Sequence, residues 1–161
     1  MGNGDYARRV RRGIALGIAL TVLFFIMGLT HVGEAYALEP RVYGYVIYSN
    51  EAIEHVNYLP TYLYFWRVST LLFLAWLIAY VAYAIKPAVT LDSSGIVYGI
   101  FYVVTHYIYL LTMGVPITIY PFIYTVKTVG SPLPYLDWGQ VVLLITIWRI
   151  YSVRKSLRGR K

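Results

Sequence analysis

The sequence predicts an all-α membrane protein, in which a bundle of four transmembrane helices carries one structured loop outside the membrane. Three observations predict this class: the scarcity of charge, the abundance of apolar residues and several long uncharged runs. Of the 161 residues, 59% are hydrophobic and only 13% are charged, whereas an ordinary soluble domain has about 25% charged residues. So little charge cannot cover a water-soluble surface, and so apolar a chain is not intrinsically disordered. The length suits a single domain, residues 1–161.

The first transmembrane span is expected at residues 14–32, which carry no Asp, Glu, Lys or Arg. About 20 such residues are needed to cross a hydrocarbon core of about 30 Å. The arginines before this run and the sequence Ala35-Tyr36-Ala37 after it also match the layout of a cleavable signal peptide. Because the apolar part of a signal peptide is only about 7–15 residues long, we expect a retained helix. Gly13, Gly17 and Gly28 are small residues of the kind that mark close contact between helices.

The second span is expected at residues 62–85. It should end at Lys86-Pro87, because proline restricts the residue before it and cannot continue a helix. A polar turn over residues 90–95 follows, in which Asp92 or Ser93 is expected to cap the next helix. The third span is then expected at residues 96–118, with a kink or an end near its glycine and prolines.

The fourth span is expected at residues 135–153. Arg149 lies near one end of it, where a long side chain can place its guanidinium among the lipid headgroups. The preceding residues 119–134 are too apolar for a freely solvated loop. We expect them to lie along the membrane interface or to fold against the bundle, because unpaired backbone cannot face lipid.

The outer loop, residues 33–61, is the one sizeable segment that these spans leave outside the membrane. Alternating side chains at residues 41–48 indicate a short strand, and residues 50–55 suit one or two helical turns. The many tyrosines of the loop suit the membrane interface, where an apolar ring meets a wet hydroxyl.

The basic residues predict the orientation of the chain. Four spans place both termini on the same side, together with eleven of the 14 lysines and arginines. These eleven are Arg8, Arg9, Arg11, Arg12, Lys86, Arg149, Arg154, Lys155, Arg158, Arg160 and Lys161. Because positive charge concentrates on the cytoplasmic side of membrane proteins, we expect a multi-pass protein of the cell membrane with both termini in the cytoplasm. The basic tails should hold anionic lipid headgroups rather than nucleic acid.

His106 is the first candidate for a functional residue, because it lies inside the third span. Counted from Ile96 it is about 15 Å deep, and an ionisable residue at that depth is a candidate for function. It could ligate a haem, relay protons or bond a quinone carbonyl. The alternative is a neutral histidine that bonds a hydroxyl or a carbonyl of a neighbouring helix. A haem held by two histidines is disfavoured, because His31 and His55 are predicted at other depths.

A second candidate group gathers at the outer ends of the spans and contains His31, Glu34, Arg67, Asp137 and Gln140. Arg67 and His31 fall at the same predicted depth. With nearby tryptophans, the group could hold a polar head such as a quinone ring, so His106, His31 and Arg67 are the candidate cofactor-binding residues. The alternative is structural: Arg67, Asp137, Glu34 and Gln140 would form an ion-pair ring that locks the helix ends, since an unpaired charge in lipid costs at least about 2.5 kcal/mol.

Cysteine and several motifs are absent from the sequence, and their absence excludes some classes of function. The chain has no cysteine, which excludes disulfides and thiolate metal sites, and we find no motif of a nucleotide-binding loop, serine hydrolase or zinc protease. The expected function is a non-catalytic subunit of a larger membrane assembly, of the respiratory or electron-transfer kind. The alternatives are a quinone- or haem-binding redox protein and a small channel or carrier. A homo-oligomer is also open. The scarcity of cysteine, asparagine and glutamine suggests a thermophilic, archaeal source.

Overall fold

The computed structural model describes the chain apart from residues 1–2, 30–44, 48–52, 56–59, 128–130 and 159–161. The described part is mostly helical. Its helices are α1 (Asn3–Leu29), α2 (Thr61–Ile85), α3 (Val89–Thr112) and α4 (Trp138–Arg158). One hairpin pairs β1 (Tyr45–Ile47) with β2 (Ile53–His55), and a three-stranded antiparallel sheet contains β3 (Ile117–Tyr120), β4 (Ile123–Val126) and β5 (Leu133–Leu136).

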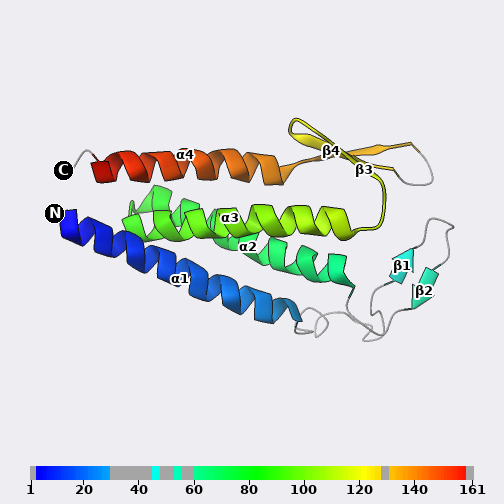
Figure 1. Cartoon of the computed structure of the whole chain (residues 1–161), viewed down its shortest axis with the longest axis horizontal. Coiled ribbons are helices and arrows are strands. Elements are labelled where there is room, and N and C mark those ends of the chain that lie inside the picture. Colours follow the sequence, from blue (N-terminus) through cyan, green and yellow to red (C-terminus); the bar gives the residue numbers. More distant parts are fainter. Residues whose placement is uncertain (1–2, 30–44, 48–52, 56–59, 128–130, 159–161) are drawn as a thin grey trace.

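Three of the helices are long and apolar enough to cross a membrane, at Gly4–Leu29, Thr61–Ile85 and Val89–Thr112. Helix α4 has 21 residues, but its second half carries four basic side chains, and it is not one of the three. Figure 1 shows the helices running side by side, with both chain termini at one end and the three-stranded sheet at the other. We call these the terminal end and the sheet end.

Helix α3 occupies the centre of the bundle, where it contacts α1, α2 and α4. The core cluster lies where α2, α3 and α4 meet and consists of Val68, Leu72, Trp76, Ala79, Tyr98, Tyr102 and Val142. Leu72 and Val142 are completely buried. The sides of the helices that face away from this core carry exposed leucines, isoleucines and valines, as a helix surrounded by lipid would.

The glycines of α1 let it pack closely against its neighbours, as the sequence predicts. A Cβ atom added to Gly13 would lie 2.5 Å from the backbone oxygen of Thr90 on α3, and one added to Gly17 would lie 2.8 Å from Cβ of Val97. At Gly28 the added atom would meet Val68 of α2 at 2.5 Å. Because these distances leave no room for a side chain, the small residues set the approach of the helices.

Helix α3 begins earlier and ends earlier than the third span expected from the sequence. It starts at Val89 after the extended residue Ala88, without a side-chain cap, so the expected turn at residues 90–95 is helical and the expected capping by Asp92 or Ser93 is wrong. Ser93 instead donates to the carbonyl oxygen of Val89 at 2.8 Å. The helix ends at Thr112 because Gly114 follows with a φ of 72°.

Residues 119–134 are where the structure departs most from the expectation of an all-α protein. Much of this segment, with the residues beside it, forms the sheet, in the order β3-β4-β5. Ile117 pairs with Val126, and Ile123 pairs with Leu136. The sheet satisfies backbone groups that a loop lying along the interface would leave unpaired. Helix α4 consequently begins at Trp138 rather than Tyr135, which belongs to β5.

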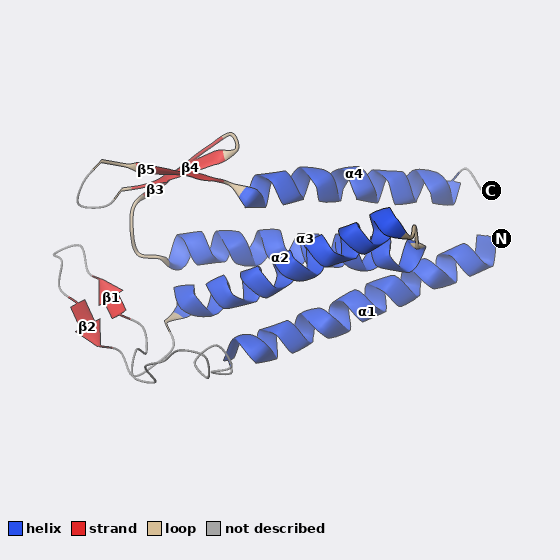
Figure 2. Cartoon of the chain, turned by 180° about the vertical axis from the view of Figure 1, so that it is seen from behind, coloured by secondary structure: helices blue, strands red, loops and turns tan. Residues whose placement is uncertain are grey.

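Before Pro60, the outer loop is described only in the strands of its hairpin, at the sheet end (Figure 2). Residues 45–47 form a strand, which confirms that part of the strand expected at residues 41–48. The helical turns expected at residues 50–55 are wrong for Ile53–His55, because these residues form β2 and pair with β1. Residues 50–52 lie outside the described part.

Candidate functional site at the sheet end of the bundle

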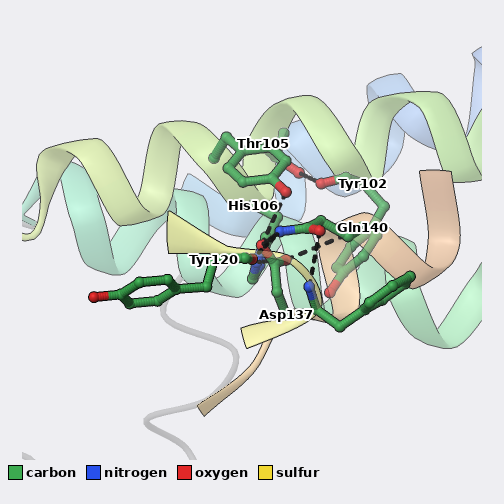
Figure 3. Close-up of polar contacts among 8 residues, drawn as sticks. Tyr102, Thr105, His106, Tyr120, Asp137 and Gln140 are labelled. Atoms are coloured by element: carbon green, nitrogen blue, oxygen red, sulfur yellow. Dashed lines mark hydrogen bonds and ion pairs between the residues drawn. The ribbon is translucent and has the colours of Figure 1, made fainter. Parts of the chain in front are cut away.

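Asp137 is the centre of the candidate site. It is 0% exposed and directly precedes α4. Its Oδ1 accepts a hydrogen bond from the backbone nitrogen of Gln140 at 3.2 Å, and its Oδ2 accepts bonds from Tyr107 at 3.0 Å and from Nε2 of Gln140 at 2.9 Å (Figure 3). The local sequence has an acceptor followed three residues later by glutamine, which is the pattern of a capping box. Asp137 therefore caps α4 and ties it to α3.

Gln140 connects this cap to the sheet. Its Nε2 donates to the carbonyl oxygen of Tyr120 at 2.8 Å, and its Oε1 accepts from the backbone nitrogen of Phe122 at 2.9 Å. The backbone nitrogen of Asp137 also donates to the carbonyl oxygen of Phe122 at 2.9 Å. These bonds hold the β3–β4 turn, in which Phe122 has a φ of 63°, against the first turn of α4.

His106 approaches the same carboxylate from α3. Its Nε2 lies 3.4 Å from Oδ1 of Asp137, which is within ion-pair distance, but the contact lacks the geometry of a hydrogen bond, and this buried nitrogen has no hydrogen-bond partner in the described part of the chain. The approach requires Gly139, because a Cβ atom there would lie 2.6 Å from Cδ2 of His106. His106 is 8% exposed.

A small cavity of about 200 Å³ opens beside His106. Aromatic rings form most of its wall, with two hydroxyls from α2. Its lining residues are Trp66, Ser69, Thr70, Phe73, Tyr102, His106, Tyr109, Tyr124 and Trp138. Such a cavity can stack a flat ring and offer it the imidazole edge as a hydrogen-bonding group.

Tyr124 enters this cavity from β4 and stacks on Tyr135, with their ring centroids 5.4 Å apart. Burial of its phenol raises the pKa of Tyr124 above the ordinary value of 10, and the nearby Tyr109, Tyr135 and Asp137 raise it further. Tyr124 therefore stays a neutral hydroxyl, available as donor and acceptor.

The depth predicted for His106 is wrong, because the helix begins at Val89 instead of Ile96. His106 lies six residues before the end of α3 at Thr112, or about 9 Å from the sheet end at 1.5 Å per residue. It is not at the middle of the helix. A difference in depth therefore no longer separates His106 from the other histidines. His31 lies outside the described residues, and the side chain of His55 is not described either.

The structure brings together three of the predicted site residues, namely His106, Asp137 and Gln140. Arg67 lies in the second turn of α2 and is partly buried. Glu34 lies outside the described residues, so the predicted pairing of Arg67 with Glu34 stays a prediction, whereas the ion pair of Asp137 is with His106 rather than with Arg67. No group of three or more metal-ligating side chains occurs in the described ranges.

A second polar contact, missed by the sequence reasoning, lies towards the terminal end. Arg149 of α4 forms a two-point ion pair with Asp92 of α3, with Nε 2.7 Å from Oδ1 and Nη2 2.6 Å from Oδ2. The guanidinium also lies 4.5 Å from the ring centroid of Tyr83 on α2. The expectation that Arg149 reaches out to the headgroups is therefore wrong.

Sequence reasoning also missed Tyr107, which donates to Asp137. It is one of 18 tyrosines, and nothing in the sequence distinguishes it from the others. The capping pattern from Asp137 to Gln140 was a usable signal for the beginning of α4. Asp92 could also have been predicted as the partner of Arg149, because it is the acid nearest the predicted inner ends of the second and third spans.

No protein-family model, no curated protein and no solved structure matches this chain.

Proposed function

We propose that this chain is a small integral membrane protein that works as a non-catalytic subunit of a larger membrane assembly, of the respiratory or electron-transfer kind. It would cross the membrane four times, with its terminal end in the cytoplasm and its three-stranded sheet at the outer surface. Three helices long and apolar enough to span a membrane support this proposal. So does the concentration of eleven of the 14 basic residues on the proposed cytoplasmic side.

The ion pair between Arg149 and Asp92 supports α4 as the fourth span. An unpaired arginine inside a membrane is costly, but here Nε and Nη2, along one edge of the guanidinium, meet a carboxylate that is only 7% exposed. With this charge neutralised, the uncharged stretch of α4 can extend from Trp138 towards Val153. The length of that stretch is about 24 Å at 1.5 Å per residue, enough for a slightly thinned bilayer.

The observation that carries the subunit proposal is the set of exposed apolar side chains on both faces of the three-stranded sheet. Seven large apolar side chains of the sheet and its turn are 43–52% exposed: Ile119, Tyr120, Phe122, Ile123, Leu133, Tyr135 and Leu136. These residues lie outside the three candidate spans, so the lipid-facing sides of those spans do not account for them. By the register of the strands, Ile119, Leu133 and Tyr135 share one face of the sheet. Exposed apolar surface of this kind marks contact with protein partners or with the membrane.

The polar cluster supports the same proposal, because it holds that surface in place. Asp137 and Gln140 direct their side-chain bonds towards α3, the β3–β4 turn and each other. Their hydrogen-bonding capacity is therefore used to fix the sheet on the helices. This arrangement suits a scaffold that presents an apolar face better than a catalytic centre.

The test is purification of the tagged protein from its native membranes in a mild detergent, followed by measurement of the particle mass. We expect a particle heavier than one chain with its detergent. In the variants Ile119→Glu and Leu133→Glu the particle should shrink to the single chain, because a charge on the sheet disfavours an apolar partner. The matched control is Ile85→Glu, which changes an 81% exposed isoleucine near the other end and should leave the particle intact. A native particle of one chain, or equal loss in the control, would contradict the proposal.

The cavity beside His106 favours a second candidate function, the binding of a quinone or another ring with polar groups. Its aromatic walls would hold the ring, and the imidazole would bond a ring oxygen. Extraction of the purified protein with organic solvent, together with its ultraviolet–visible spectrum, tests this candidate. A bound quinone would support it, and a Soret band would indicate haem instead. A colourless, quinone-free protein would rule it out.

A further inference from the structure

A narrow groove near the terminal end separates α1 from α4. Both helices pack on α3, and they make few contacts with each other. The groove is lined by Val10 and Ile14 of α1, Ile96 of α3, and Ile150, Val153 and Arg154 of α4. Its walls are thus almost entirely apolar, and a single guanidinium stands at its border.

The size of the groove limits what can fill it. Its volume is about 220 Å³, which is too small to enclose a helix about 10 Å wide. A partner helix would reach into it only with the tips of its side chains. A segment of one acyl chain can lie in the groove, and it is apolar like the walls. Ser93, the polar residue that α3 contributes, has its hydroxyl bonded to the carbonyl oxygen of Val89, so it makes no demand for a polar occupant.

The charge around the groove defines the head of the occupant. Among the side chains that the structure describes, no carboxylate pairs with Arg154, because Asp92 is engaged by Arg149. On α1, Arg8, Arg9, Arg11 and Arg12 are all exposed within the turns that contribute Val10 and Ile14. The parallel N–H groups of an arginine guanidinium can donate hydrogen bonds to two oxygens of one phosphate. An apolar slot bordered by Arg154, with further exposed guanidiniums on the neighbouring turns of α1, is complementary to an acyl chain that ends in a phosphate.

We infer that the groove between α1 and α4 is a specific site for one anionic phospholipid, with an acyl chain against Ile14, Ile96 and Ile150 and its phosphate on Arg154. This inference rests on the proposed membrane location with a cytoplasmic terminal end, but not on the proposed partner at the sheet. It differs from general attraction of basic tails to anionic lipid, because it assigns one arginine and one slot. Arg154 should matter more than its neighbour Lys155, which does not line the groove.

The experiment measures lipid retained by the purified full-length protein after exchange into nanodiscs that contain equal amounts of phosphatidylglycerol and phosphatidylcholine. Native mass spectrometry of the released protein counts the bound lipids. We expect one phosphatidylglycerol per chain, held in preference to phosphatidylcholine. Arg154→Gln should weaken retention about fivefold, the loss expected for one basic contact. The matched control, Lys155→Gln, should change it less than twofold.

A second variant tests the slot itself. Val153→Phe should fill part of the groove and reduce retention while leaving all charges in place, with Val81→Phe on the exposed side of α2 as its control. Equal losses in Arg154→Gln and Lys155→Gln would mean diffuse attraction to the basic tail and would overturn the site. Absence of retained lipid, or no effect of Val153→Phe, would also overturn it. Because the particle mass in native membranes is a separate measurement, failure of the partner proposal would not be confused with failure of the lipid site.

Discussion

At the scale of single residues, the buried side chain of Asp137 joins α3 to the first turn of α4. It receives bonds from α3 and α4 while being completely buried. A buried donor or acceptor that is left without a hydrogen-bond partner lowers the stability of the fold by about 1–3 kcal/mol. This makes Asp137 the residue at which the connection between α3 and α4 at the sheet end can be broken most directly.

Asp137→Asn should lower the free energy of unfolding by about 2 kcal/mol, because the amide presents its own donors to the donors of Tyr107 and Gln140. Thermal unfolding in detergent measures the loss. Asp5→Asn is the control, since Asp5 is exposed in the first turn of α1, and it should cost no more than about 0.5 kcal/mol. Equal stability of Asp137→Asn and the parent would show that the carboxylate does not support the fold.

His106→Gln should preserve the fold at a cost of about 1 kcal/mol, because glutamine keeps a donor and an acceptor near Asp137. The melting temperature in detergent reports the stability, and the particle mass in native membranes reports the assembly. Both should survive the change. A variant as stable as the parent that has lost a bound quinone or chromophore would instead establish the redox function.

Sequence reasoning identified the residue types of the site but not their connections. His106, Asp137 and Gln140 are uncommon polar residues in apolar surroundings, and for this reason they could be singled out. Their meeting point depends on the sheet, because the turn at Phe122 supplies the backbone groups that Gln140 binds. A turn with φ of 63° at phenylalanine has no reliable sequence signal, since few residues other than glycine adopt it.

At the scale of helices and strands, the long apolar helices could be predicted from the sequence, but the helix ends that lie among polar residues could not. The expected second span at residues 62–85 differs by one residue from α2, because proline after Lys86 marks the end. The error at α3 has a physical cause. Ser93 and Ser94 donate hydrogen bonds to backbone oxygens of the preceding helical turn, and Asp92 forms an ion pair with Arg149. Polar residues that suggest a turn in the sequence therefore have hydrogen-bond partners inside a helix.

Gly13→Ala should destabilise the packing of α1 on α3 by about 1–3 kcal/mol. The added methyl would meet the backbone of Thr90, which cannot rotate away as a side chain can. Gly4→Ala is the matched control on the same helix, because nothing lies within 4 Å of its added Cβ, and it should be neutral or slightly stabilising. Thermal unfolding of the two variants side by side gives the comparison. Equal effects would mean that the close approach at Gly13 is unimportant.

The pair between Arg149 and Asp92 should behave as a coupled unit. Arg149→Met alone should cost about 3–5 kcal/mol, because it leaves the buried carboxylate of Asp92 without its partner. The double variant Arg149→Met with Asp92→Leu should recover most of this loss. A double-mutant cycle on unfolding free energies measures the coupling. Additive losses would contradict the pairing of α3 with α4.

At the scale of the whole molecule, the two ends of the bundle differ in the charge of their side chains. The terminal end holds the arginines of α1 and the basic second half of α4, and the sheet end holds aromatic rings around one buried carboxylate. In the proposed orientation, the first end meets the anionic cytoplasmic leaflet and the second meets a partner.

The most direct test of this account is the number of membrane crossings, which decides where both ends lie. The chain has no cysteine, so single cysteines at Ser49 and Ser156 can be labelled in intact cells with a thiol reagent that does not cross membranes. Four crossings predict that position 49 is labelled and that position 156 is protected until the cells are opened. Labelling of both positions would show that α4 does not cross. Labelling of position 156 alone would mean that the orientation is inverted, and either result would contradict the account.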